Sequence, residues 1–185
     1  MMFGSDAALD LSGSFHVSTA DYLRMGDNER FYARPQANDV LSVAAPAAFG
    51  FLEDAPASVA VEGNGELSTE IWGEDYDNWW DETDTDSLFP GLVVPEGETT
   101  SVIGGDINIK GTFFADEEYK TKTPLGTNLS APWGQISLAS VGGAGEVNVT
   151  ESGLDISAEL LGDITISDGA KITVNSASDD DLYIS

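Results

Sequence analysis

The sequence has no cysteine, one histidine and few basic residues. The absence of cysteine from all 185 residues excludes disulfides, thiolate metal ligands and cysteine nucleophiles. His16 stands alone, so no histidine cluster is available to hold zinc. Seven Lys and Arg residues stand against 33 Asp and Glu residues, which gives a formal net charge of −26. We expect no nucleic-acid partner, because binding to phosphates requires basic side chains.

Long apolar runs are also missing. No stretch is long and apolar enough to cross a membrane, so we expect a chain that does not span one. The opening residues, MMFGSDAALD, show neither the basic region nor the apolar core of a signal peptide. Glycine (20 residues) and proline (7 residues) are frequent, and helix-forming runs are few, which indicates β structure.

The chain does contain short apolar runs that alternate with polar residues and are bounded by Gly, Pro, Asn, Asp or Ser, the pattern of strands and turns. Apolar pairs recur about every 18 residues in the last third, where stacked repeats would bury a face that one repeat cannot bury alone. The pairs are Ile136/Leu138, Leu154/Ile156 and Ile172/Val174, with Val147/Val149 and Ile164/Ile166 between them. The pattern predicts a single all-β domain over residues 1–185, a parallel β-solenoid. A β-sandwich is the alternative.

Two segments interrupt this rhythm. Residues 62–91 form an acidic, tryptophan-rich insertion, with no Lys or Arg between Glu62 and Asp86. Residues 111–128 have mixed charge and are expected to form a hairpin insertion. In solenoids, such insertions map to loops on one face.

The acidic insertion supplies candidate ligands for a calcium ion and for a sugar. Hard cations take clustered carboxylate oxygens, which makes Asp81, Asp84 and Asp86 the Ca²⁺ candidates. The segment lacks the glycine and the closing Glu of an EF-hand loop, so a solvated acidic loop without a cofactor is the favoured interpretation.

The aromatic side chains of the same insertion allow two interpretations. Exposed aromatic rings can stack on sugar rings, which would make this chain a carbohydrate-binding module. They can equally pack the loop back on the solenoid, because large aromatic side chains bury much area. Packing is favoured, and the candidate ligand contacts are Trp72, Tyr76, Trp79 and Trp80.

Two enzyme hypotheses can be framed, and we favour neither. Ser14, His16 and Asp21 suggest a triad, but no nucleophile elbow or oxyanion donor accompanies them, so His16 is expected at a solvent-facing strand position. A calcium-dependent β-helix polysaccharide lyase would need Arg24 or Lys110 to meet carboxylates in a groove. The acidic surface argues against an acidic substrate, and the stretch DNERFYARP predicts a turn with solvated charges. We therefore expect no enzyme.

Several blocks along the chain resemble the secretion domain of filamentous haemagglutinin-type exoproteins, the large partners of two-partner secretion systems in Gram-negative bacteria. The resemblance covers most of residues 3–149 and keeps the order of that family. The blocks are Phe3-Gly4, LDLSGSF (9–15), STAD (18–21), LSVAAPAAFGFL (41–52), VPEGETTSVIGGDINI (94–109) and LSAPWGQISLASVGGAGEV (129–147).

This resemblance implies a right-handed parallel β-helix with a non-enzymatic role. It implies export through an outer-membrane TpsB-type transporter with POTRA domains. The complete protein would then be extracellular or held at the cell surface, as an adhesin or haemagglutinin that binds a host or bacterial receptor or glycan. The family begins with a signal peptide and an Asn-Pro motif, whereas this sequence starts at the block after that motif, so we expect an N-terminally truncated member. The acidic insertion has no counterpart in the family pattern.

Overall fold

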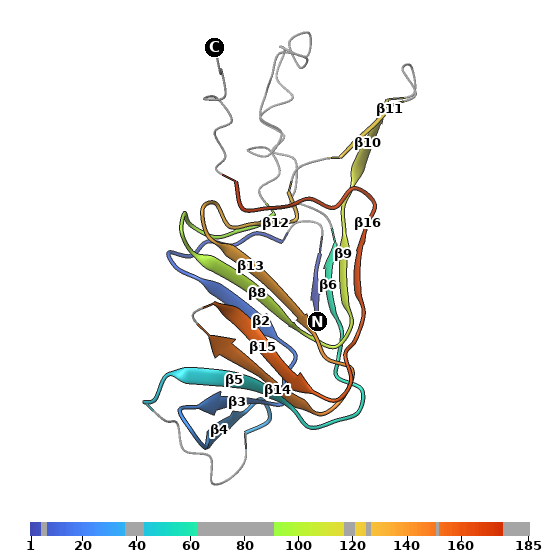
Figure 1. Cartoon of the computed structure of the whole chain (residues 1–185). Helices are drawn as coiled ribbons and strands as arrows, with labels where there is room; N and C mark the ends of the chain where they lie inside the picture. Colours follow the sequence, from blue (N-terminus) through green and yellow to red (C-terminus); the bar gives the residue numbers. More distant parts are fainter. Residues whose placement is uncertain are drawn as a thin grey trace.

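A computed structural model of the chain describes residues 1–4, 7–35, 43–62, 91–116, 121–124, 127–150 and 152–175. These residues form β-strands joined by turns, and they include no helix (Figure 1). The all-β class expected from the frequent turn residues and short alternating runs is therefore confirmed.

Three of the sheets are parallel. We name them sheets A, B and C, and each contains strands from distant parts of the chain. Sheet A consists of β1 (Met2–Phe3), β6 (Val59–Glu62), β9 (Ile107–Lys110) and β16 (Ile164–Ser167). Sheet B consists of β2 (Phe15–Ser18), β8 (Thr99–Gly104) and β13 (Gln135–Ser140). Sheet C consists of β7 (Leu92–Val93), β12 (Leu129–Ser130) and β17 (Ile172–Thr173).

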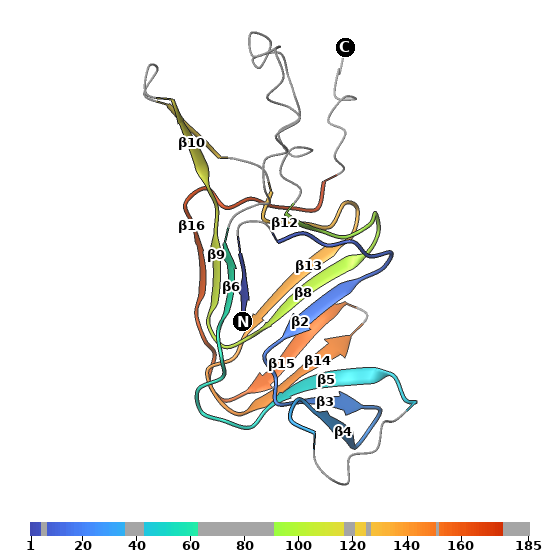
Figure 2. The ribbon, with the colours of Figure 1, turned by 180° about the vertical axis from the view of Figure 1, so that it is seen from behind.

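The chain visits these sheets in a fixed order. From β6 it passes to β7, β8 and β9, and thus from sheet A to C to B and back to A; it then continues through β12, β13, β16 and β17 in the same order. We call one passage of the chain through these sheets a coil. Each returning strand pairs in parallel with the strand that the preceding passage placed in the same sheet. As a result, strands that are far apart in the sequence lie side by side within each parallel sheet, as Figures 1 and 2 show.

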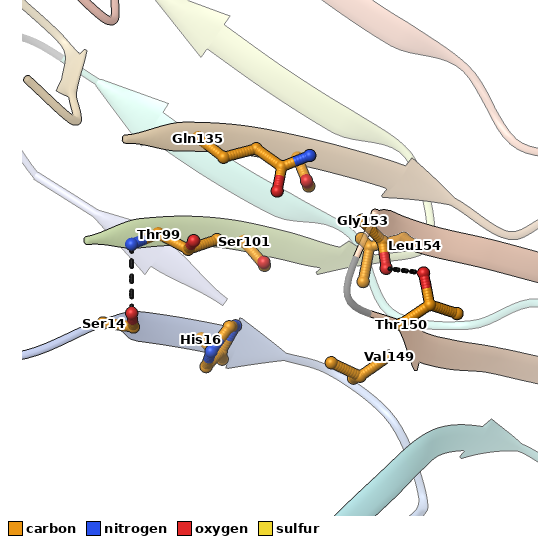
Figure 3. A pocket seen from close by; sticks show the side chains of 10 residues that line it. Ser14, His16, Thr99, Ser101, Gln135, Val149, Thr150, Gly153 and Leu154 are labelled. Carbon is orange, nitrogen blue, oxygen red and sulfur yellow. Dashed lines mark hydrogen bonds between the residues drawn. The ribbon is translucent and has the colours of Figure 1, made fainter. Parts of the chain in front are cut away.

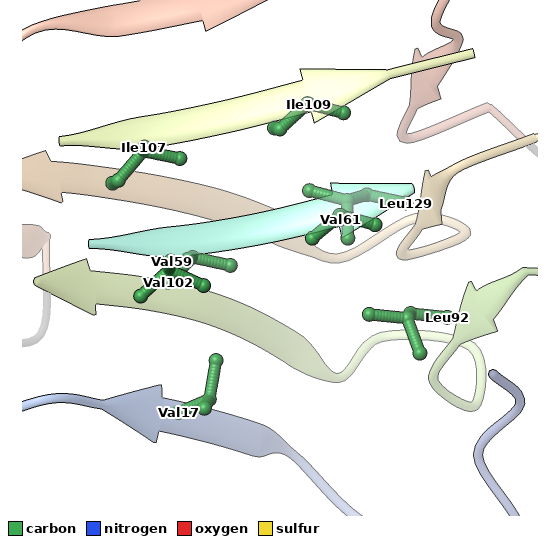
Figure 4. Packing of buried hydrophobic residues seen from close by; sticks show 8 residues of the cluster. All are labelled: Val17, Val59, Val61, Leu92, Val102, Ile107, Ile109 and Leu129. Atoms are coloured by element: carbon green, nitrogen blue, oxygen red, sulfur yellow. The ribbon is translucent and has the colours of Figure 1, made fainter. Parts of the chain in front are cut away.

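The core lies between the three parallel sheets. Alternate residues of each strand point inward: in β9, Ile107 and Ile109 are buried while Asn108 and Lys110 are exposed. Register places equivalent side chains in stacks, so that Ile107 lies between Val59 and Ile164. Figure 4 shows the main cluster, which consists of Val17, Val59, Val61, Leu92, Val102, Ile107, Ile109 and Leu129. Each such side chain contributes about 1.5–3 kcal/mol when fully buried.

The recurrence of apolar pairs in the sequence is not the length of a coil. Ile136, Leu154 and Ile172 belong to β13, β15 and β17, which lie in three different sheets. The parallel partner of Ile136 is Thr100, and that of Leu129 is Leu92. Leu129 also pairs with Ile172, and Ile107 pairs with Val59 and Ile164. The distance along the chain between parallel partners therefore varies and is roughly two to three times the spacing of the apolar pairs. That spacing measures the distance from one strand to the next and not the length of a repeat.

A fourth sheet is antiparallel and interrupts the coils. Its order is β15-β14-β5-β3-β4, and Figure 2 shows it beside the end of sheet B. Its strands are β3 (Tyr22–Met25), β4 (Glu29–Tyr32), β5 (Pro46–Phe51), β14 (Gly145–Thr150) and β15 (Gly153–Ala158). The expectation that DNERFYARP forms only a turn is wrong in part, because Glu29–Tyr32 pair with β3. The turn itself is confined to residues 26–28.

The antiparallel sheet covers part of the outer face of sheet B. Ile103 points away from the main core, and together with Ala139 it packs against Phe51 and Val147 of the antiparallel sheet. This second cluster also includes Val141, and all five residues are almost fully buried. At this end, sheet B therefore has apolar contacts on both faces.

A hairpin projects from the coil after β9. Its strands, β10 (Phe113–Asp116) and β11 (Thr121–Pro124), pair antiparallel, and they lie within the segment 111–128. It follows sheet A and precedes β12 of sheet C, so it leaves the stack at a corner. Of the acidic insertion, residues 62–91, all but Glu62 and Gly91 lie outside the described residues.

Equivalent corners of successive coils use different residues. The turn at Pro95–Glu98 and the turn at Ala131–Gly134 are each closed by a hydrogen bond from the fourth amide to the first carbonyl, at 3.1 and 2.9 Å. The third residue has positive φ in both: Gly97 at 80° and Trp133 at 54°. Glycine adopts this conformation at no cost, whereas an L side chain is strained there. Trp133 is nevertheless 70% exposed.

Candidate functional site

The aromatic and acidic candidates of the sequence lie outside the described residues. They are Trp72, Tyr76, Trp79, Trp80, Asp81, Asp84 and Asp86. In the described part of the chain, no group of three or more His, Asp or Glu side chains gathers as a metal site would require. The same residues include no helix that is long and apolar enough to cross a membrane.

His16 lies on the outer face of sheet B, as its place in the alternation predicted. Its neighbours Phe15 and Val17 turn inward toward the main core, while His16 is exposed. The proposed triad partners are engaged elsewhere. Ser14 donates a hydrogen bond to Glu98 (2.6 Å), and the Asp21 carboxylate accepts one from the amide of Leu52 (2.8 Å). Ser14, His16 and Asp21 therefore do not form a triad.

A groove runs over the uncovered end of the outer face of sheet B (Figure 3). Its floor consists of two rows of side chains in register across β2, β8 and β13: Ser14, Thr99 and Gln135 in one row, His16, Ser101 and Ser137 in the other. Its wall is the turn of the β14–β15 hairpin, through Val149, Thr150, Gly153 and Leu154. The groove has a volume of about 210 Å³.

The end of the groove is fixed by hydrogen bonds. Ser14 accepts from the amide of Thr99 at 3.0 Å, and Gln135 donates its amide N–H to the Ser152 carbonyl at 3.3 Å. Thr150 donates to the Gly153 carbonyl at 2.9 Å. Gly153 has a φ of 127°, and a Cβ there would lie 3.0 Å from the Gln135 amide nitrogen. The hairpin turn and the first floor row are therefore tied together.

The second floor row is chemically different. Partial burial lowers the pKa of His16 from its ordinary value of 6.5, so the imidazole is neutral at pH 7 and offers one donor and one acceptor. Ser101 is almost fully buried at the base of the groove. The described hydrogen bonds include none that involves the side chain of His16, Ser101 or Ser137. This row therefore presents hydrogen-bonding groups to the groove.

The basic residues named for a lyase lie apart. Arg24 lies on β3 of the antiparallel sheet, where its Nε donates to Glu146 at 3.1 Å. Lys110 lies at the end of β9 in sheet A, 3.8 Å from Asp168 with both side chains exposed. Neither residue lines the groove. They do not converge on a common set of carboxylates as a lyase would need.

Arg24 instead belongs to a polar network on one face of the antiparallel sheet. The Glu146 carboxylate of β14 accepts from Arg24 through one oxygen and from the Tyr22 hydroxyl (2.7 Å) through the other. Arg24 also donates to Asn148 and to the Gly26 carbonyl, both at 2.8 Å. Because Tyr22 and Arg24 start on β3 and reach β14, their side chains cross over β5.

The residues of β5 under this network are small for that reason. Register places Gly50 between Tyr22 and Glu146, and Ala48 between Arg24 and Asn148. A Cβ at Gly50 would lie 1.9 Å from the Tyr22 ring. The sequence signal was the pair of small residues alternating with phenylalanine in AAFGF, which sequence reasoning did not use.

The network shifts the pKa values of its members. The hydrogen bond from Tyr22 and the contact with Arg24 lower the pKa of Glu146. Burial first, and then the bond to this carboxylate, raise the pKa of Tyr22 to about 12. Arg30 lies 4.2 Å over the Tyr22 ring, a cation–π contact. The network therefore pairs the charges of Arg24 and Glu146 with each other.

Comparison with known proteins found no match. No family model, no curated protein and no solved structure matches this chain.

Proposed function

We propose that this chain is the β-helical portion of an exoprotein exported by two-partner secretion, with a non-enzymatic role as a secreted or surface-exposed adhesin or haemagglutinin. The observation that carries the proposal is the cyclic order of the parallel sheets, A to C to B, in which each strand pairs with its equivalent in the coil before. That order is expected of a parallel β-helix, and we propose the right-handed form for these coils.

The blocks that resemble the exoprotein family coincide with elements of the coils. VPEGETTSVIGGDINI contains the corner turn, β8 and the start of β9, and LSAPWGQISLAS contains β12 and β13. Two glycines of these blocks lie where a side chain would collide with the backbone of another segment. A Cβ at Gly105 would lie 2.1 Å from the carbonyl oxygen of Pro56, and a Cβ at Gly134 would lie 1.8 Å from the carbonyl oxygen of Glu98. These close backbone contacts between coils support the resemblance with a physical reason.

Stepwise stacking suits passage through an outer-membrane pore. Each coil that folds outside supplies an edge on which the next coil pairs, so folding itself makes passage one-way. The partner in this proposal is an outer-membrane transporter with POTRA domains. The absence of cysteine removes disulfides that would lock a folded state before passage.

Export dependent on the transporter tests the proposal. The chain is fused to a cleavable signal peptide and expressed in a Gram-negative host, with the transporter encoded nearest to its gene. Its amount in the medium and in the periplasm is measured by immunoblot. We expect the chain in the medium with the intact transporter, and in the periplasm when the POTRA domains are deleted.

A matched pair of variants controls for leakage and for folding. Asn108→Ala, at an exposed position of β9, is expected to be exported like the parent. Ile107→Asp places a charge in the core stack and is expected to reduce recovery of protease-resistant protein outside the cell. Equal release with and without the POTRA domains, or retention of the parent in the periplasm beside an intact transporter that exports its own exoprotein, would overturn the proposal.

A further inference from the structure

The groove lies on the outer face of sheet B, away from the main core of the parallel sheets. Its floor is a sheet face and not a sheet edge. The central strand β8 pairs on both sides, with β2 and with β13, and the two edges of the sheet lie at the outer sides of β2 and β13, beside the floor. A peptide that binds by adding a strand requires free backbone groups at an edge. A ligand of this groove is therefore held by side chains.

The charge of the groove selects the ligand class. The ten residues that line it include hydroxyl, amide and imidazole groups and no Lys, Arg, Asp or Glu. The chain as a whole has a net charge of −26. Recognition of a carboxylate, sulfate or phosphate relies on Arg or Lys, and the surrounding acidic surface repels such groups. The Glu98 carboxylate contacts the lining residue Ser14, from which it accepts a hydrogen bond, and a single carboxylate supplies too few ligands for a hard cation.

The two sides of the groove supply the two kinds of contact that an uncharged sugar requires. His16, Ser101 and Ser137 lie in one register row across three strands and line the groove; Figure 3 shows His16 and Ser101. Val149, which is 37% exposed, and Leu154 form the apolar part of the wall that rises beside this floor. Sites for small ligands combine such apolar walls with a few placed polar groups.

We propose that this groove binds an uncharged, hydroxyl-rich ligand, a segment of a neutral glycan, whose hydroxyls bond to the row of His16, Ser101 and Ser137 while its ring faces contact Val149 and Leu154. The hydrogen bonds that fix Ser14, Gln135 and Thr150 hold the groove in shape before the ligand arrives, which lowers the entropic cost of binding. None of the ten residues described as lining the groove belongs to the segment 62–91.

Calorimetry on the purified full chain tests the proposal. The probes are neutral hexasaccharides of glucose, galactose, mannose and N-acetylglucosamine, and one anionic hexasaccharide of galacturonate. At least one neutral probe is expected to bind, and the anionic probe is not. His16→Ala and Ser137→Ala are expected to weaken binding roughly tenfold each, the loss of one well-placed hydrogen-bonding group.

Two control variants make the result specific. Thr165→Ala changes an exposed hydroxyl on the outer face of sheet A and should leave binding unchanged. Trp79→Ala tests the insertion instead of the groove. The proposal is overturned if no neutral probe binds, if only the anionic probe binds, or if Trp79→Ala abolishes binding while His16→Ala and Ser137→Ala do not affect it. Because the purified chain is used, each of these outcomes is separate from the export result. Unchanged circular dichroism confirms that the variants, which alter groove-facing side chains, are folded.

Discussion

The parallel sheets and the antiparallel sheet are held together by different means. In the parallel sheets, Val, Leu and Ile side chains stack inward from coil to coil. In the antiparallel sheet, one face packs on sheet B and the other is crossed by a polar network centred on Glu146. The first arrangement tolerates many apolar residues of similar volume. The second depends on particular side chains and on the small residues beneath them, so the two regions should respond differently to substitution.

The largest effect is expected in the parallel stacks. Ile107→Ala removes a fully buried side chain between Val59 and Ile164 and should lower the free energy of unfolding by about 2–5 kcal/mol. Asn108→Ala, at the exposed position beside it, should change that free energy by less than about 0.5 kcal/mol. Urea unfolding measures both. Equal effects would mean that the stack does not hold the coils together.

The next effect separates steric fit from burial in the antiparallel sheet. Gly50→Ala places a methyl group within the present position of the Tyr22 ring and should cost about 1–3 kcal/mol. In a Tyr22→Ala background the same substitution should cost less than about 1 kcal/mol, because the obstacle is gone. Urea unfolding of the four proteins in this cycle gives the coupling. If the costs of Gly50→Ala and Tyr22→Ala simply add in the double variant, the Tyr22 ring does not need a glycine at position 50.

A smaller effect of the network depends on pH. Glu146→Gln should lower the free energy of unfolding by about 1 kcal/mol at pH 7. The lowered pKa of Glu146 means that its carboxylate stabilises the fold above the ordinary value of 4.5 and loses this contribution as the pH falls through the folded-state pKa. The difference between parent and variant should therefore shrink below pH 4.5. A constant difference down to pH 3 would contradict this account.

The corner of the parallel coils offers a stabilising change. Trp133→Gly gives this turn the residue type that Gly97 supplies at the equivalent turn. It relieves a positive φ that costs an L residue roughly 1–2 kcal/mol, against an entropic cost of about 0.4–1 kcal/mol for glycine in the unfolded chain. Thermal unfolding should show a gain of about 0.5–1 kcal/mol. A loss would mean that the exposed indole makes contacts that outweigh the strain.

The smallest effect concerns His16. Its lowered pKa means that the folded chain resists protonation, so stability should fall as the pH drops below 6.5, the unfolded value, toward the folded-state pKa. His16→Gln removes this dependence. Between pH 7.5 and pH 5.5, the urea midpoint of the parent should fall more than the urea midpoint of the variant. An unchanged difference would show that the imidazole is freely solvated.

The sequence predicted the strand class but not the path of the chain. Ile136, Leu154 and Ile172 each begin an apolar pair, and a pair looks the same whether its strand lies in sheet B, the antiparallel sheet or sheet C. Alternation reports that one face of a strand is buried and not against which strand it packs. The antiparallel sheet was missed for the same reason, since β14 and β15 fit the series.

The candidate site was predicted even less well. The outward position of His16 followed from alternation, but its partners Ser101 and Ser137 lie far away in the sequence and meet it only through register. Serines also carry no pattern of their own. The tryptophans and aspartates of the acidic insertion were candidate ligands for a sugar and for Ca²⁺ because they are clustered in the sequence. They lie outside the described residues.

The Glu146 network also sets an order of events in time. Tyr22 and Arg24 lie 124 and 122 residues before their partner Glu146 in the sequence. In the same way, β2 pairs with β8, which comes much later in the chain. A ribosome delivers the amino-terminal end first. The strands β3, β4 and β5 are thus available early, but their polar face stays unsatisfied until β14 arrives. Contacts between residues so far apart in the sequence slow folding. The polar network of the amino-terminal strands is therefore completed only when a carboxy-terminal strand, β14, has been made.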